Sequence, residues 1–259
     1  MIGAILGDVV GSHFEHFPTK YTDFELFSEH SFFTDDTVLT VAVADWLLHG
    51  GELHSYFHDY VERYPGAGYG GTFLHWAQCR DTEPYGSWGN GSAMRVAPVA
   101  YTQDSLDEVL QVAQRTASVT HNHPNGILGA LAVAGSTFIT RTGGSKDDVR
   151  RFVDNHIGYD LSRTVDSIRP QYSFDVSCDG SVPEAITAFL ESTSVEDAIR
   201  LAISLGGDSD TMACIAGAIA EPFFGGVPDS LWQQTVTRLD DRLLSIINEF
   251  RCKYPTTIG

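Results

Sequence analysis

The sequence predicts an all-α fold, in which one compact multi-helix domain spans residues 1–259. Apolar residues recur at helical spacing in most segments of the chain. Residues that favour helix starts precede several of these segments. Convincing period-two alternation is absent, and the best short candidate for a strand is Tyr172 to Val176. Helices therefore have to supply the core.

The N-terminal third contains two predicted helices and two glycine-rich loops. Glycines at positions 3, 7 and 11 are four residues apart, so they line one face of a helix and permit close packing. Residues 38–47 are mostly apolar and form a helix after the acidic pair at 35–36. Residues 66–71 and 86–91 are rich in glycine and are expected to connect helices.

The middle of the chain contains clear helix starts. Ser105 and Glu108 form a capping box before the next helix, and Ser145 starts another. Between them, residues 127–139 are almost all apolar and small, which predicts a central, buried helix. Residues 141–182 are weakly patterned, so the boundaries of elements there are not predicted.

Four helices are expected in the C-terminal part. Pro183 is placed in the first turn of a helix that continues through residues 185–190, because proline is tolerated there. Residues 194–197 cap a helix over 198–205, and residues 211–220 form a small, apolar helix. Pro228 opens a final amphipathic helix that runs through Ile246.

The composition excludes several classes of protein. The chain has 16 basic and 34 acidic residues and a formal net charge of −18, which disfavours binding to a nucleic-acid backbone. A small anionic ligand stays possible, because backbone amides or metal ions can hold one. The four cysteines contain no CxxC pair and predict reduced thiols. We expect a cytoplasmic protein that does not enter a membrane, because no signal peptide or long apolar run is present.

Two acidic turns are the most informative motifs. One contains Thr34, Asp35 and Asp36, the other contains Asp208, Asp210 and Thr211, and each precedes a small, apolar helix. Either turn alone is explained by helix capping. If the two helices are neighbours, however, four carboxylates converge, and two of them about 4.5 Å apart repel by roughly 3–4 kcal/mol. Oxygen ligands alone favour a hard divalent cation, and this set is large enough for two ions.

Three further motifs indicate a ligand site only in combination with the two acidic turns. Glu15 lies two helical turns after Asp8, although alone it reads as a surface acid. The glycine-rich turn at 86–91 leads into a helix and offers backbone N–H groups that suit phosphate. His121 or His123 could bond a ligand hydroxyl or stack on a ring, or could be structural.

The order of these motifs resembles that of the ADP-ribosylglycohydrolase family. The matching segments are GDVVGSHFE, FTDDT, GYGGT, GNGSAMR, THNHP and LGGDSDT, and the resemblance as a whole extends from residue 3 to residue 225. The resemblance implies an all-helical fold with a centre of two divalent cations, Mg²⁺ or Mn²⁺. It also implies hydrolysis of a glycosidic bond that releases ADP-ribose, with an arginine linkage as the default by analogy.

The resemblance assigns roles to individual residues. It implies that Glu15, Asp35 and Asp36 are catalytic, with Glu15 on a flap that reaches the metals or the substrate. The implied metal ligands are Thr34, Asp35, Asp36, Asp208, Asp210 and Thr211. The implied substrate-binding residues are Gly70, Gly71, Gly89, Asn90, Gly91, Ser92 and His121.

The implied partners are an ADP-ribosylated protein or small molecule and, as product, ADP-ribose. A nucleic acid is expected only as a modified substrate. Two alternatives stay open at this point: a non-catalytic ADP-ribose-binding or structural relative, and a di-metal phosphohydrolase. Intact carboxylates argue against the first, because a protein without catalysis has no use for mutually repelling acids. The order of motifs argues against the second.

Overall fold

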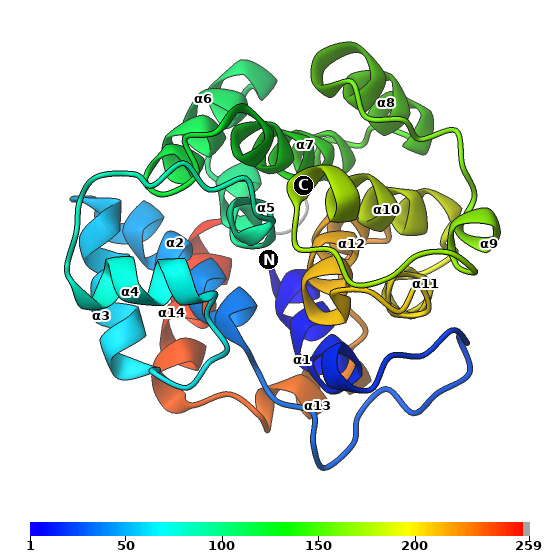
Figure 1. Ribbon diagram of the computed structural model, residues 1–259, viewed down its shortest axis with the longest axis horizontal. Helices are drawn as coiled ribbons and strands as arrows, with labels where there is room; N and C mark the ends of the chain where they lie inside the picture. The colour runs from blue at the N-terminus through cyan, green and yellow to red at the C-terminus, as the bar shows by residue number, and fades with distance from the viewer. Residues whose placement is uncertain (256–259) are drawn as a thin grey trace.

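The computed structural model describes residues 1–255 and confirms the all-α prediction: these residues form fourteen α-helices and no β-strand (Figure 1). The helices are α1 (Ile2–His16), α2 (Asp35–His49), α3 (Leu53–Arg63), α4 (Gly71–Gln78), α5 (Gly91–Met94), α6 (Leu106–Ser118), α7 (Pro124–Arg141), α8 (Lys146–Phe152), α9 (Val165–Ile168), α10 (Cys178–Glu191), α11 (Val195–Ile203), α12 (Ser209–Phe223), α13 (Asp229–Val236) and α14 (Asp241–Lys253). A 3₁₀ turn, η1 (Ala97–Tyr101), and a π-helical turn, η2 (Val153–Ile157), complete the set.

The centre of the molecule is the pair α1 and α12, which lie against each other along the glycine face predicted from the sequence. A methyl group added to Gly7 would lie 2.1 Å from the carbonyl oxygen of Ala213. A methyl group on Gly3 would likewise lie 2.2 Å from the carbonyl oxygen of Gly217, at another point of contact between the two helices. Only glycine permits this backbone approach, so the spacing of four residues sets the distance between the two helices.

The other helices surround this pair. Figure 1 shows α2, α3, α4 and α14 on one side, and α9, α10 and α11 on the other. Helices α7, α10 and α11 pack against α12, and α2 packs against α1. Their apolar side chains form one continuous cluster of buried residues. The acidic N-terminal ends of α2 and α12 lie on the same side of this core, which places both acidic turns together.

Most of the predicted helix starts are confirmed by side-chain caps. Ser105 and Ser145 each form a capping box, with Glu108 and Asp148 respectively. Ser194 accepts a hydrogen bond from the backbone N–H of Asp197 at the start of α11. Each cap satisfies backbone donors that the first turn of a helix leaves without partners.

The predicted place of Pro183 was wrong, because this residue lies inside α10 rather than in its first turn. The helix begins five residues earlier, where Ser177 accepts a hydrogen bond from the N–H of Gly180. The N–H of Cys178 also donates to the carbonyl of Trp88 at 3.1 Å. These anchors extend the helix towards its N-terminus despite the donor that proline lacks.

Two further predictions are corrected. Residues 172–176 form no strand; the pairing in this region is a single bridge between Gly89 and Ser177. The single last helix that we expected after Pro228 is divided into α13 and α14. Asp240 accepts a hydrogen bond from the N–H of Leu243 and so caps the start of α14. A short polar turn therefore interrupts the amphipathic pattern.

All four cysteines are free, in agreement with the prediction of reduced thiols. Among residues 1–255, no helix has both the length and the apolar content that crossing a lipid bilayer requires.

Candidate active site

Five carboxylates from three helices and their adjoining turns gather beside α1 and α12. The ligand atoms of Asp8, Asp36 and Asp210 all lie within 4.8 Å of one another. Those of Glu15, Asp208 and Asp210 form a second group with the same limit, so Asp210 belongs to both. The convergence of the two acidic turns that the sequence suggested is therefore present in the structure.

Asp8 is held by the first turn of α2. Its carboxylate accepts hydrogen bonds from the backbone N–H of Thr34 and of Thr37, both at 3.0 Å. The hydroxyls of the same two threonines also donate to it, at 2.7 Å from Thr34. Asp8 thus satisfies donors at the N-terminus of α2 and fixes this end of the helix beside α1.

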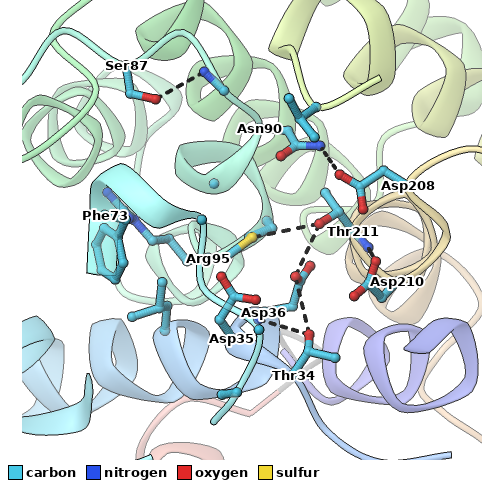
Figure 2. A pocket seen from close by; sticks show the side chains of 18 of the residues that line it. Thr34, Asp35, Asp36, Phe73, Ser87, Asn90, Arg95, Asp208, Asp210 and Thr211 are labelled. Carbon is cyan, nitrogen blue, oxygen red and sulfur yellow. Dashed lines mark hydrogen bonds between the residues drawn. The ribbon is translucent and has the colours of Figure 1, made fainter. Parts of the chain in front are cut away.

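Asp36 is the buried acid with an unused acceptor atom. Its Oδ2 accepts a hydrogen bond from the hydroxyl of Thr211 at 3.1 Å, as Figure 2 shows, whereas its Oδ1 has no partner among the described residues. Burial and then the charges of Asp8 and Asp35 raise the pKa of Asp36 well above its usual value. A buried carboxylate oxygen without a donor favours a ligand that supplies positive charge.

Asp35 is half-buried and faces the same space (Figure 2). Burial, followed by the charges of Asp8 and Asp208, raises the pKa of Asp35 to about 8. Gly68 lies next to it with a positive φ of 97°, and a methyl group there would come within 3.5 Å of Asp35 Oδ1. This distance is an ordinary van der Waals contact, so glycine is favoured at this turn by the positive φ and not by lack of space.

Asp208 is tied to the second glycine-rich loop. The side-chain amide of Asn90 donates to Asp208 Oδ2 at 2.8 Å (Figure 2) and to the hydroxyl of Ser181 at 3.2 Å. The backbone N–H of Asn90 donates to the carbonyl of Val176 at 2.8 Å. Asn90 thereby fixes loop 86–91 against α10 and against the acidic turn at the start of α12.

The residues present fit a divalent cation. Every candidate ligand atom is a carboxylate or hydroxyl oxygen, which is the donor set preferred by Mg²⁺, Mn²⁺ and Ca²⁺. Asp36 Oδ1 is an orphaned acceptor within the first group, and the pKa of each clustered acid is raised by burial and, for most, by other carboxylates. A bound cation reverses this effect by favouring the ionised carboxylates.

Four of the five clustered acids, all but Asp8, line a cavity of about 740 Å³, which is large enough for a nucleotide-sized ligand. Residues of loops 66–71 and 86–91 and His121 also line it. Three exposed aromatic side chains, Phe32, Trp88 and Phe174, lie at its rim. Arg95 is the sole arginine or lysine among the described residues that line it, so little side-chain charge is available to an anionic ligand.

Comparison with known proteins agrees with this arrangement. The model of the ADP-ribosylglycohydrolase family matches residues 1–253. The chain belongs to the ADP-ribosylglycohydrolase family. It is 28% identical to ADP-ribosylhydrolase ARH3 of Mus musculus and to that of Homo sapiens, over 91% of this chain and 85% and 87% of theirs. It is also 28% identical to ADP-ribosylarginine hydrolase Tri1 of Pseudomonas putida, over 60% of this chain and 45% of Tri1.

A solved structure supports the ADP-ribosylglycohydrolase fold. It is titled as an ADP-ribosylglycohydrolase-related protein complex and superimposes with a TM-score of 0.75 at 22% sequence identity. The match covers 99% of this chain and 96% of that one.

The structure brings together nearly all the residues that the resemblance singled out in this member of the family. Those that line the cavity are Glu15, Thr34, Asp35, Asp36, Gly70, Gly71, Gly89, Asn90, Gly91, His121, Asp208, Asp210 and Thr211. Glu15 lies in the last turn of α1, half-buried, and burial followed by the charge of Asp208 raises its pKa. Ser92 is the exception: it is buried away from the cavity and donates its hydroxyl proton to the carbonyl of Gly126 at 2.6 Å.

Sequence reasoning did not assign Asp8 to the site. The available signal was its distance of seven residues from Glu15, which places both acids on one face of α1. Sequence reasoning also missed Phe174 and Val176 at the rim of the cavity. They belong to the weakly patterned segment, whose position depends on the contact with Asn90.

Proposed function

We propose that this protein is a metal-dependent ADP-ribosylhydrolase that cleaves the glycosidic bond between ADP-ribose and an acceptor and releases ADP-ribose. The observation that carries the proposal is the pair of acidic groups that share Asp210, beside a cavity that two glycine-rich loops also line. The names of the ARH3 and Tri1 relatives, both hydrolases of ADP-ribosyl compounds, support it.

The acidic cluster would hold two divalent cations, Mg²⁺ or Mn²⁺. The first group would supply Asp8 and Asp36, the second would supply Asp208, and Asp210 would serve both. Glu15, the third member of the second group, would stay free of the cations for proton transfer. Thr34, Asp35 and Thr211 lie beside these groups and would complete the set. When bound, the cations would orient the ribose hydroxyls and offset the negative charge of the carboxylates.

The reaction replaces the bond between the anomeric carbon and the acceptor by a bond to water. Positive charge develops on the ribose in the transition state, and the leaving atom has to receive a proton. The nearby carboxylates would stabilise the positive charge, and Asp35 and Asp36, which line the cavity, would position the attacking water. Glu15 belongs to the second acidic group and lines the cavity, and burial followed by the charge of Asp208 raises its pKa, so it would be the acid that donates a proton to the acceptor.

We propose an arginine linkage as the substrate to test first. The printed activity of Tri1, an ADP-ribosylarginine hydrolase, supports it. Glu15 and the exposed ring of Phe32 line the cavity at its acidic end, and a guanidinium acceptor would meet a carboxylate and an aromatic face there. ADP-ribose itself would lie along loops 66–71 and 86–91. The N–H groups of Ser87, Gly89 and Asn90 already donate within the protein, so other backbone N–H groups of these loops and the cations would have to replace the missing basic side chains.

The test is release of ADP-ribose from arginine-, serine- and nucleobase-linked ADP-ribosyl substrates, each with Mg²⁺, with Mn²⁺ and with EDTA. Metal-dependent release from the arginine linkage is the expected result. Release from another linkage would retain the reaction and change the acceptor. ADP-ribose binding without any release would indicate a binding protein, and hydrolysis of p-nitrophenyl phosphate alone would indicate a phosphohydrolase.

A further inference from the structure

The inference concerns Arg95, a fully buried arginine at the C-terminal end of α5. Its guanidinium lies 4.4 Å from the centre of the Phe57 ring and 5.8 Å from that of Phe73. Nη2 donates a hydrogen bond to the hydroxyl oxygen of Thr120 at 2.7 Å, whereas Nε and Nη1 have no partner among the described residues. The two aromatic faces and the contact with Thr120 offset only part of the cost of burying this cation, because two of its donor atoms have no partner in residues 1–255.

The contact with Thr120 has one possible direction. A guanidinium donates hydrogen bonds and cannot accept them, and the pKa of Arg95, lowered by burial to about 10, still leaves it charged near neutral pH. The oxygen of Thr120 is therefore the acceptor in this bond. The single proton of the Thr120 hydroxyl stays available for another acceptor.

That acceptor is the ring of His121, whose Nδ1 lies 2.7 Å from the Thr120 oxygen. Burial and the charge of Arg95 lower the pKa of His121 well below its usual value, so the ring is neutral. A neutral ring that accepts at Nδ1 carries its proton on Nε2. The Tyr85 side chain also interacts with that of Thr120, and its phenol can donate to the Thr120 oxygen without competing for the proton.

Nε2 of His121 faces the second glycine-rich loop and the cavity. A methyl group on Gly91 would lie 3.4 Å from this nitrogen, and one on Gly89 would lie 3.9 Å from it. Among the described residues, no acceptor forms a hydrogen bond with Nε2. An N–H group without a partner therefore points to the place where a ligand would lie along the loop.

We propose that Arg95 is a positioning residue which, through Thr120, keeps His121 in the tautomer that presents an Nε2–H donor to an oxygen atom of the bound ligand. The inference rests on the proposed function for the identity of the ligand, ADP-ribose. His121 then selects a phosphate or hydroxyl oxygen at this point and cannot act as a base there, because its basic nitrogen faces Thr120.

The test is the ¹⁵N spectrum of the histidine rings in the Mg²⁺-loaded protein without substrate, with the signals of His121 identified by their absence from His121→Gln. A single neutral tautomer protonated at Nε2 is expected. A ring protonated at Nδ1, with the Thr120 proton directed to Tyr85, would overturn the proposal, as would a doubly protonated ring.

Variants then test the role of Arg95. Arg95→Met and Thr120→Val should each raise the Nδ1–H population of His121 and weaken ADP-ribose binding by about three- to tenfold, the value of one hydrogen bond. Thr120→Ser should restore both properties. Arg141→Met is the matched control, because Arg141 also stacks on an aromatic ring, Tyr101, but does not line the cavity.

Two outcomes separate this inference from the proposed function. If Arg95→Met and Thr120→Val both leave the His121 spectrum unchanged, Arg95 does not position the ring. If the spectrum changes as expected but the wild-type protein neither binds ADP-ribose nor releases it from any substrate, the tautomer assignment stands and the proposed function fails. Should Arg95→Met not fold, the comparison of Thr120→Val with Thr120→Ser decides the matter.

Discussion

Replacing Asp36 by asparagine should stabilise the protein in EDTA and weaken its response to Mg²⁺. The ligand atoms of Asp8, Asp36 and Asp210 lie within 4.8 Å of one another, so each ionised pair repels by about 3 kcal/mol at an effective dielectric constant of 20. Protonation already relieves part of this repulsion, because the pKa of Asp36 is raised. We therefore expect a net gain of about 1 kcal/mol, or roughly 2–4 °C in Tm.

The assay is thermal unfolding of the wild type and Asp36→Asn, each in EDTA and in saturating Mg²⁺. The wild type should gain stability from the cation, since a ligand that binds only the folded state raises Tm. Asp36→Asn should unfold at a higher temperature than the wild type in EDTA and at a lower one in Mg²⁺. Its two unfolding curves should lie close together.

Asp45→Asn is the matched control, because Asp45 is a buried acid on the same helix, outside the cluster. Its carboxylate accepts hydrogen bonds from the Tyr60 hydroxyl at 2.7 Å and from the His49 ring at 2.8 Å. This variant should lose stability equally in EDTA and in Mg²⁺. A lower Tm for Asp36→Asn than for the wild type in EDTA would refute the repulsion argument. An unchanged Mg²⁺ response would remove Asp36 from the metal site.

Three other predictions follow from the same contacts. Because the pKa of Asp35 is raised to about 8 in the folded state, the folded protein binds more protons than the unfolded one, so stability in EDTA should fall as pH rises from about 4 to 8. Over the same range the Mg²⁺ affinity measured by calorimetry should rise about tenfold per pH unit for each proton that the cation displaces. An affinity that does not change with pH would contradict this. Gly7→Ala should cost at least about 2–3 kcal/mol in chemical denaturation, whereas Gly66→Ala, with open space around it, should be neutral. Glu15→Gln should lower kcat at least about 100-fold with little change in ADP-ribose affinity, and an unchanged kcat would exclude Glu15 as the acid.

Most of the fold could be predicted from local pattern. The helices that begin at Asp35, Leu106 and Ser209 follow from apolar spacing and capping residues, which act within one or two turns of chain. The start of α10 could not be predicted, because it depends on the bond from Cys178 to the distant Trp88 carbonyl. The break before α14 needed the cap at Asp240 to be weighed against a continuous apolar pattern.

The residues of the candidate site could be predicted from the sequence, whereas the hydrogen bonds that join them could not. Two acidic turns and two glycine-rich loops are visible in the sequence, and their convergence follows once α2 and α12 are neighbours. The placement of Asn90 on Asp208 arises only from tertiary packing. The same holds for Asp8, which spans from the middle of α1 to the first turn of α2.

The position of Asp8 links the packing of the core to the chemistry of the site. Asp8 reaches α2 because α1 lies against α12 at the distance that Gly7 and its neighbours allow. The same contact brings Asp210 on α12 close to Asp8. The tight packing of α1 on α12 therefore keeps the repelling carboxylates close together and buried. A cluster on mobile loops would relieve its repulsion by moving apart. On α1 and α12 it cannot do so, and beyond the partial relief that protonation gives, binding a cation lowers its energy.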